Sequence, residues 1–103
     1  MGKTAIIGFN NRDPEWQMLL EKTPLPFSFW SIPKNDEEEK NLIACLKSSD
    51  CIIVSSDYPR KFLKQIRKME AKIFIIDPSV IKKNVEGDIV TCNFKTFKAL
   101  YKP

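Results

Sequence analysis

Polar and acidic side chains follow the most apolar stretches of this chain, where an enzyme could carry catalytic groups. The run "CIIVSSDYPRKF" places Ser55, Ser56 and Asp57 directly after an apolar segment, and the run "KIFIID" ends on Asp77. Two such carboxylates could share acid–base work if the two segments are neighbours. Each aspartate, however, is followed by a proline within two residues, and this pattern favours helix capping as the role of both.

The sequence lacks the residues and spacings of the common catalytic and cofactor sites. It has no histidine, which excludes Ser-His-Asp and Cys-His catalysis and removes the commonest metal ligand. The stretch "GFNNRD" has one glycine where a dinucleotide loop needs three, and no P-loop or flavin phosphate loop is present. Cys45, Cys51 and Cys92 fit no zinc spacing and are expected to be small buried side chains. We therefore expect no cofactor and no metal, and an enzyme is the less favoured class.

The composition is that of one small folded domain covering residues 1–103. Hydrophobic residues make up 43% of the chain, enough for one ordinary core. No apolar run approaches the roughly 20 residues of a membrane helix, and "MGKTAIIGF" is neither a secretory signal nor a myristoylation site. We expect a cytoplasmic protein without membrane contact, in which cysteines stay reduced.

Charge is distributed unevenly along the chain. The net charge of +4 divides into −2 up to Ser56 (6 Lys/Arg against 8 Asp/Glu) and +6 from Asp57 onward (11 against 5). A basic second half could favour an acidic partner. Surface lysines that keep a small protein soluble are the simpler explanation.

Strand and helix patterns alternate along the whole chain. Compact apolar runs predict strands over residues 3–9, 27–32, 51–54, 72–77 and 88–93. Helical spacing of apolar residues predicts helices over residues 10–22, 33–50, 59–70 and 94–102. Asp13 is the expected first N-cap, and Asn35 or Asp36 the second, followed by acidic residues that suit a helix start. Residues 78–87 allow only two turns of helix or a loop.

Such alternation is typical of a three-layer α/β fold, a doubly wound five-stranded parallel sheet covered by helices on both faces. Ligands of such sheets bind beyond the C-terminal ends of the strands. That rule selects a candidate ligand-binding pocket made of Asn10, Asn11, Ser55, Ser56, Asp57, Asp77 and Cys92.

The stretch "SDCIIVSSDYPRKFLKQIRK" resembles response-regulator receiver domains. In that family an acid, an apolar strand, a phosphoacceptor Asp and a proline four residues later precede a helix. Asp50 and Pro59 match the acid and the proline, whereas Ser55 stands at the phosphoacceptor position. The stretch "EGDIVTCNF" is similar to the family's G-A-D-D-Y-L-x-K-P-F, with Cys92 and Asn93 in place of the Lys-Pro pair.

The resemblance implies a receiver-like scaffold whose chemical positions are altered. Asn10 and Asn11 stand near the place of the family's two Mg²⁺-binding acids. Without those carboxylates, the acceptor Asp and the lysine, the usual phosphorylation is not expected. The resemblance further implies a flavodoxin-like sheet of order 2-1-3-4-5. The short segment between Asp77 and Asp88 leaves the family's helix four short or absent.

Three functions stay open. The favoured one is a regulatory protein-interaction module, a degenerate or pseudo-receiver that works by binding a protein partner or itself without phosphorylation. The second is a small-molecule or nucleotide binder at the polar strand ends, and the third an enzyme using Asp57 and Asp77. The candidate partner surface comprises Arg60, Lys64, Arg67, Lys68, Phe94, Lys95, Lys98 and Tyr101. We do not expect a nucleic-acid partner, because aromatics do not interleave the basic helix and the net charge is modest.

Overall fold

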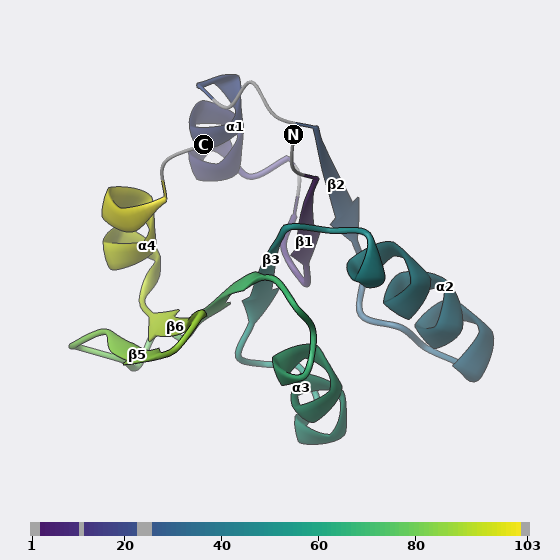
Figure 1. Ribbon diagram of the computed structural model, residues 1–103. Helices are drawn as coiled ribbons and strands as arrows, with labels where there is room; N and C mark the ends of the chain where they lie inside the picture. Colours follow the sequence, from purple (N-terminus) through teal and green to yellow (C-terminus); the bar gives the residue numbers. More distant parts are fainter. Residues whose placement is uncertain (1–2, 11, 23–25, 102–103) are drawn as a thin grey trace.

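A computed structural model describes residues 3–10, 12–22 and 26–101, which form one sheet covered by helices (Figure 1). The strands are β1 (Thr4–Ile7), β2 (Phe27–Trp30), β3 (Cys51–Ser55), β4 (Lys72–Ile76), β5 (Asn84–Glu86) and β6 (Ile89–Cys92). The helices are α1 (Pro14–Glu21), α2 (Asp36–Lys47), α3 (Arg60–Arg67) and α4 (Phe94–Leu100). The predicted α/β class is confirmed.

The sheet has the order β2-β1-β3-β4-β6-β5. The pairs from β2 through to β6 are parallel, so the C-terminal ends of these strands share one edge of the sheet. The prediction of a purely parallel sheet of five strands is therefore wrong in one respect, because β5 adds a sixth strand antiparallel to β6. Gly87, at φ +61°, closes this hairpin between the two strands. Turns and β5 thus occupy the segment between β4 and β6.

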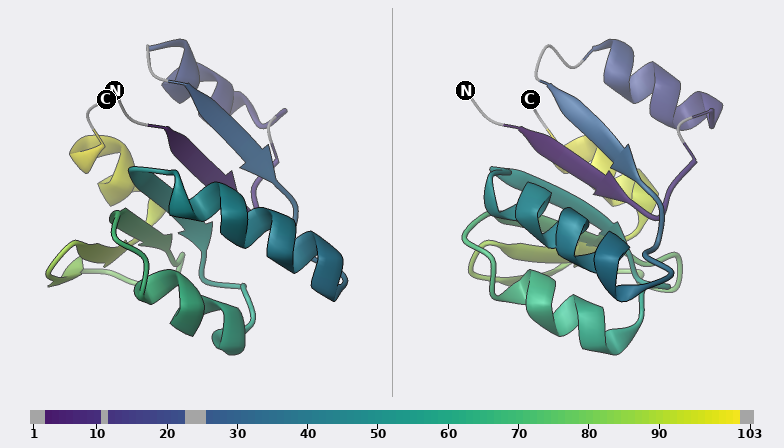
Figure 2. Two further views of the ribbon diagram at one scale, coloured as in Figure 1. Left: turned by 45° about the vertical axis from the view of Figure 1, so that its right-hand side comes forward. Right: turned by 90° about the vertical axis from the view of Figure 1, so that its right-hand side faces the viewer.

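Two apolar cores lie on opposite faces of the sheet. On one face Ala5, Ile7, Ile52 and Val54 pack against α2 and α3, and on the other Ile6 and its neighbours pack against α1 and α4. The views in Figure 2 show α2 and α3 together in front of the strands. Because successive strand residues point to opposite faces, strands covered on both sides are apolar on both faces, as "CIIV" and the buried stretch "IFII" are.

Side-chain caps start two of the helices as their sequences predict. Asp13 accepts a hydrogen bond from the Glu15 N–H at 2.9 Å, with Pro14 at the first helical position of α1. Asn35 Oδ1 accepts from the Glu38 N–H at 2.8 Å, which identifies Asn35 as the cap of α2. The acidic first turn of α2 is stabilised by the positive end of the helix dipole.

Candidate functional site

The predicted pocket residues lie at the C-terminal edge of the sheet, as the topology requires. Asn10 follows β1, Ser55 ends β3 with Ser56 and Asp57 after it, and Asp77 follows β4. β1, β3 and β4 are adjacent in the sheet, so their ends are neighbours. Asn11 lies outside the described residues.

The side chains of Asn10 and Ser55 close turns by accepting hydrogen bonds from backbone N–H groups two residues further along the chain. Asn10 Oδ1 accepts from the Arg12 N–H at 2.9 Å, and Ser55 Oγ from the Asp57 N–H at 3.2 Å. The Ser56 N–H donates to the Ile76 carbonyl at 3.0 Å and so extends the pairing of β3 with β4. Ser55 is only 8% exposed. Because local hydrogen bonds already occupy Asn10 and Ser55, the edge has the character of a set of tight turns.

Asp77 holds the turn after β4. Its Oδ1 accepts from the Ser79 N–H at 2.9 Å and from Ser79 Oγ at 2.7 Å. These two hydrogen bonds lower the pKa of the Asp77 carboxyl, because they stabilise its charged form. The expected capping role is thus present at Asp77, but it stabilises a turn, since no helix follows.

Asp57 does not cap α3, so that prediction is wrong. The N-cap position is Pro59, and no side chain accepts a hydrogen bond from the first turn. Asp57 is exposed, and its backbone N–H is held by Ser55. Within residues 3–10, 12–22 and 26–101, no three His, Cys, Asp or Glu side chains gather where they could hold a metal ion.

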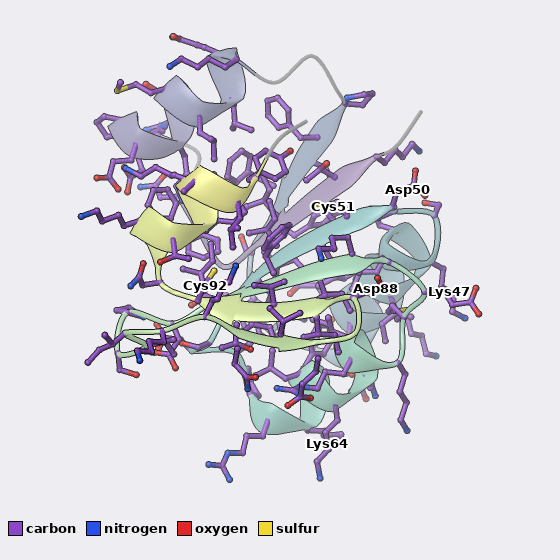
Figure 3. All side chains as sticks on the ribbon, turned by 60° about the vertical axis from the view of Figure 1, so that its left-hand side comes forward. Lys47, Asp50, Cys51, Lys64, Asp88 and Cys92 are labelled. Carbon is purple, nitrogen blue, oxygen red and sulfur yellow. The ribbon has the colours of Figure 1, made fainter. Side chains whose placement is uncertain are left out.

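Cys92 points away from this edge into the core under α4 (Figure 3). It is 0% exposed and packs with Val90 and Phe97. Burial raises the pKa of its thiol. Cys92 follows Val90 by two residues and therefore points to the same face of β6, and this spacing is the sequence signal that places it in the core. Cys92 is thus not available to a ligand at the strand ends.

A cleft of about 220 Å³ lies beside the strand ends, between the start of α2 and the start of α3. Ile32, Lys34 and Asp36 line it together with Glu39, Tyr58, Lys61 and Phe62. Sequence analysis missed this site, because its walls come from segments far apart in the chain.

The candidate partner residues divide between two faces of the molecule. Arg60, Lys64, Arg67 and Lys68 are exposed on α3, and Lys64 points away from the sheet (Figure 3). α4 lies on the opposite face of the sheet, so its residues cannot share a surface with those of α3.

The aromatic residues of α4 contribute little to a surface. Tyr101 is 8% exposed and packs on Phe97, and Phe94 is half-buried against Trp16. Lys95 and Lys98 are exposed, with Lys98 Nζ 5.3 Å from the ring centroid of Phe94. The basic face of α3 is therefore the more accessible of the two candidate surfaces.

Comparison of the chain with protein-family models, with curated proteins and with solved structures gave no match. Of the helices in the described part of the chain, none combines the length and the apolar character needed to cross a membrane.

Proposed function

We propose that this chain is a regulatory protein-interaction module that binds an acidic protein partner through the basic face of α3. That face consists of Arg60, Lys64, Arg67 and Lys68. The single observation that carries the proposal is the charge of α3. Residues 60–68 hold five cations and no acid, and every one of the five is exposed.

Stability of α3 explains only part of this charge, because the helix dipole favours Lys64 and Arg67 in the last turn but not the cations of the first turn. The helix is held by Phe62 and Ile66, which are buried against the sheet. Cations at the start of a helix oppose the dipole by about 0.3–1 kcal/mol each, and α3 begins with Arg60 and Lys61. Like charges four residues apart, as at Arg60 and Lys64, destabilise the helix by a further few tenths of a kcal/mol. An acidic partner would turn this repulsion into attraction.

The strand ends also fit a protein that works through a partner surface and not through phosphoryl transfer. Ser55 lies at the end of β3, where the receiver resemblance places the phosphoacceptor, and its Oγ is engaged by the Asp57 N–H. On the proposed pseudo-receiver scaffold, incubation with acetyl phosphate and Mg²⁺ leaves the intact mass unchanged. An added phosphoryl group would contradict this part of the proposal.

The partner surface is tested by matched charge reversals. One variant carries Arg60→Glu, Lys64→Glu and Arg67→Glu. The control variant carries Lys22→Glu, Lys95→Glu and Lys98→Glu, three exposed positions at the C-cap of α1 and on α4 with the same change in net charge. Circular dichroism confirms that both variants are folded before binding is compared.

Proteins captured from nuclease-treated extract by the wild-type chain are identified, purified and titrated against all three forms. We expect an acidic protein whose Kd rises more than tenfold with the α3 variant, is unchanged with the control, and weakens with salt. Equal effects of the two variants, loss of binding with the control variant alone, or capture that disappears on nuclease treatment would each refute the proposed surface.

A further inference from the structure

A tyrosine that lines the cleft between α2 and α3 has a buried hydroxyl without a hydrogen-bond partner among the described residues. Tyr58 lines the cleft and is 3% exposed, and its ring packs on Phe62 with centroids 4.5 Å apart. Its Oη is buried and makes no hydrogen bond within the described residues. Leaving a buried hydroxyl unpaired costs about 1–3 kcal/mol, and phenylalanine would pack in the same place without that cost. The unpaired hydroxyl is therefore evidence for a ligand group that forms a hydrogen bond with it.

The α3 side of the cleft is electropositive. Pro59, at the N-cap of α3, has no side-chain acceptor, so that only its carbonyl accepts from the first turn, from the Phe62 N–H at 2.9 Å, and this turn has no acidic residue. Lys61, in that first turn, also lines the cleft. An uncapped helix start with a cation beside it attracts a carboxylate or another small anion.

The α2 side of the cleft has the opposite character. The start of α2 has a side-chain cap, since Asn35 Oδ1 accepts from the Glu38 N–H, and the Glu38 carboxylate accepts from the Lys34 N–H just before the helix at 2.7 Å. Asp36 and Glu39 add two carboxylates to this wall against the single ammonium group of Lys34, so the wall is negative on balance. Such a wall suits a ligand ammonium group, whereas a second anion would be repelled.

We propose that the cleft binds a small zwitterion of the free α-amino acid class. Its carboxylate lies at the start of α3 within reach of the Tyr58 hydroxyl and Lys61, and its ammonium group faces Glu39 and Asp36. Ile32 and Phe62 provide an apolar wall for its side chain. The cleft volume of about 220 Å³ is below the roughly 300–1,000 Å³ of drug-sized sites, which fits a ligand of this size.

The hydroxyl is suited to donate. Burial, and to a smaller extent the Glu39 carboxylate, raises the pKa of Tyr58, so the phenol keeps its proton at neutral pH. This site uses none of the residues of the proposed partner surface and does not depend on that function.

The test uses the full chain and the common L-α-amino acids, each added at millimolar concentration in a thermal-shift screen and then in calorimetric titration. We expect at least one to raise the melting temperature. Tyr58→Phe weakens its binding at least tenfold, because a hydrogen bond to a charged group is lost. Tyr101→Phe is the matched control, since it removes a buried hydroxyl on the opposite face of the sheet and leaves binding unchanged.

Two further comparisons distinguish the zwitterion from simpler ligands. The N-acetylated amino acid lacks the ammonium charge and the methyl ester lacks the carboxylate, and both are expected to bind at least tenfold more weakly. Without ligand, Tyr58→Phe leaves the melting temperature unchanged or raises it. Failure of every amino acid to bind, undiminished binding by Tyr58→Phe or by either derivative, or a lower melting temperature of Tyr58→Phe without ligand would overturn the proposal.

Discussion

Replacing Gly8 with alanine tests how closely the end of β1 packs against the end of β3. Gly8 has φ +83°, and a Cβ built on it would lie 3.3 Å from the Cβ of Ser55. Gly87 provides the matched control, because its φ is also positive, at +61°, but a Cβ there would meet nothing within 4 Å. The pair therefore separates backbone strain, which both substitutions cause, from crowding, which only Gly8→Ala causes.

The magnitudes follow from these two terms. A left-handed backbone costs an alanine roughly 1–2 kcal/mol, and this is the whole expected loss for Gly87→Ala. Gly8→Ala adds a contact with a residue that cannot move freely, since Ser55 is paired with Ile76 in the sheet. Overpacking of this kind costs about 1–3 kcal/mol, so Gly8→Ala should lose about 2–5 kcal/mol in all. A domain of this size has about 5–15 kcal/mol in all, so the variant should still fold.

Urea denaturation followed by circular dichroism measures both losses. The difference of about 1 kcal/mol or more corresponds to a melting temperature lower by about 4–8 °C for Gly8→Ala than for Gly87→Ala. Equal losses would show that the end of β3 yields to the added methyl group. No loss at either position would refute the argument from positive φ.

Three further predictions concern the core, the turn after β4 and a thiol. Phe97→Ala should lower the free energy of unfolding by about 3–5 kcal/mol, whereas Leu100→Ala, 36% exposed on the same helix, should cost far less; equal losses in denaturation would refute the packing of α4. The hydrogen bonds from Ser79 lower the pKa of Asp77. The stability that Asp77 contributes is therefore present above the pKa of an unfolded Asp and is lost as the pH falls through the folded pKa. Ser79→Ala should raise the Asp77 pKa in an NMR titration, and an unchanged titration would contradict this. Cys92, which is buried with a raised pKa, should resist iodoacetamide at pH 8 until urea unfolds the chain; because Cys45 and Cys51 are only half-buried, peptide mapping by mass spectrometry distinguishes the sites, and a labelled Cys92 in the native protein would contradict this.

Much of the fold follows from local patterns in the sequence. Apolar runs such as "CIIV" indicate strands buried on both faces, and Asp13 and Asn35 mark helix starts because their side chains accept hydrogen bonds within one turn. β5 could not be predicted in this way. All three of its residues are exposed, so no apolar pattern marks it, and it forms through pairing with β6.

The candidate site was only partly accessible from sequence. The topology rule correctly brought Asn10, Ser55 and Asp77 to one edge, but it did not predict that their side chains would bond to nearby backbone. Those bonds depend on turn geometry. The walls of the cleft depend on how α2 and α3 lie next to each other, so the position of Tyr58 beside Glu39 has no local signature.

The distribution of charge on the α2–α3 face connects the two proposals. The described residues contain one ion pair, between Arg67 Nη1 and Glu86 Oε2 at 3.7 Å, and both side chains are largely exposed. Such pairs contribute little stability. The acids of α2 gather where its dipole stabilises them, whereas Arg60 and Lys61 stand where the dipole of α3 opposes them.

Only the second arrangement lacks an explanation within the fold, and an external anion explains it in two distinct ways. A partner on the outer face would engage Arg60 together with Lys64 and Arg67, whereas a ligand carboxylate at the start of α3 would engage Lys61. If the partner were the only anion, the wild-type chain would bind no amino acid, and neither would Lys61→Ala. If the cleft were the only site, reversing the charges of Lys64 and Arg67 would not change which proteins the chain captures. Because the two residue sets do not overlap, the two explanations can fail separately, and the cations of α3 can be assigned to one, to the other or to both.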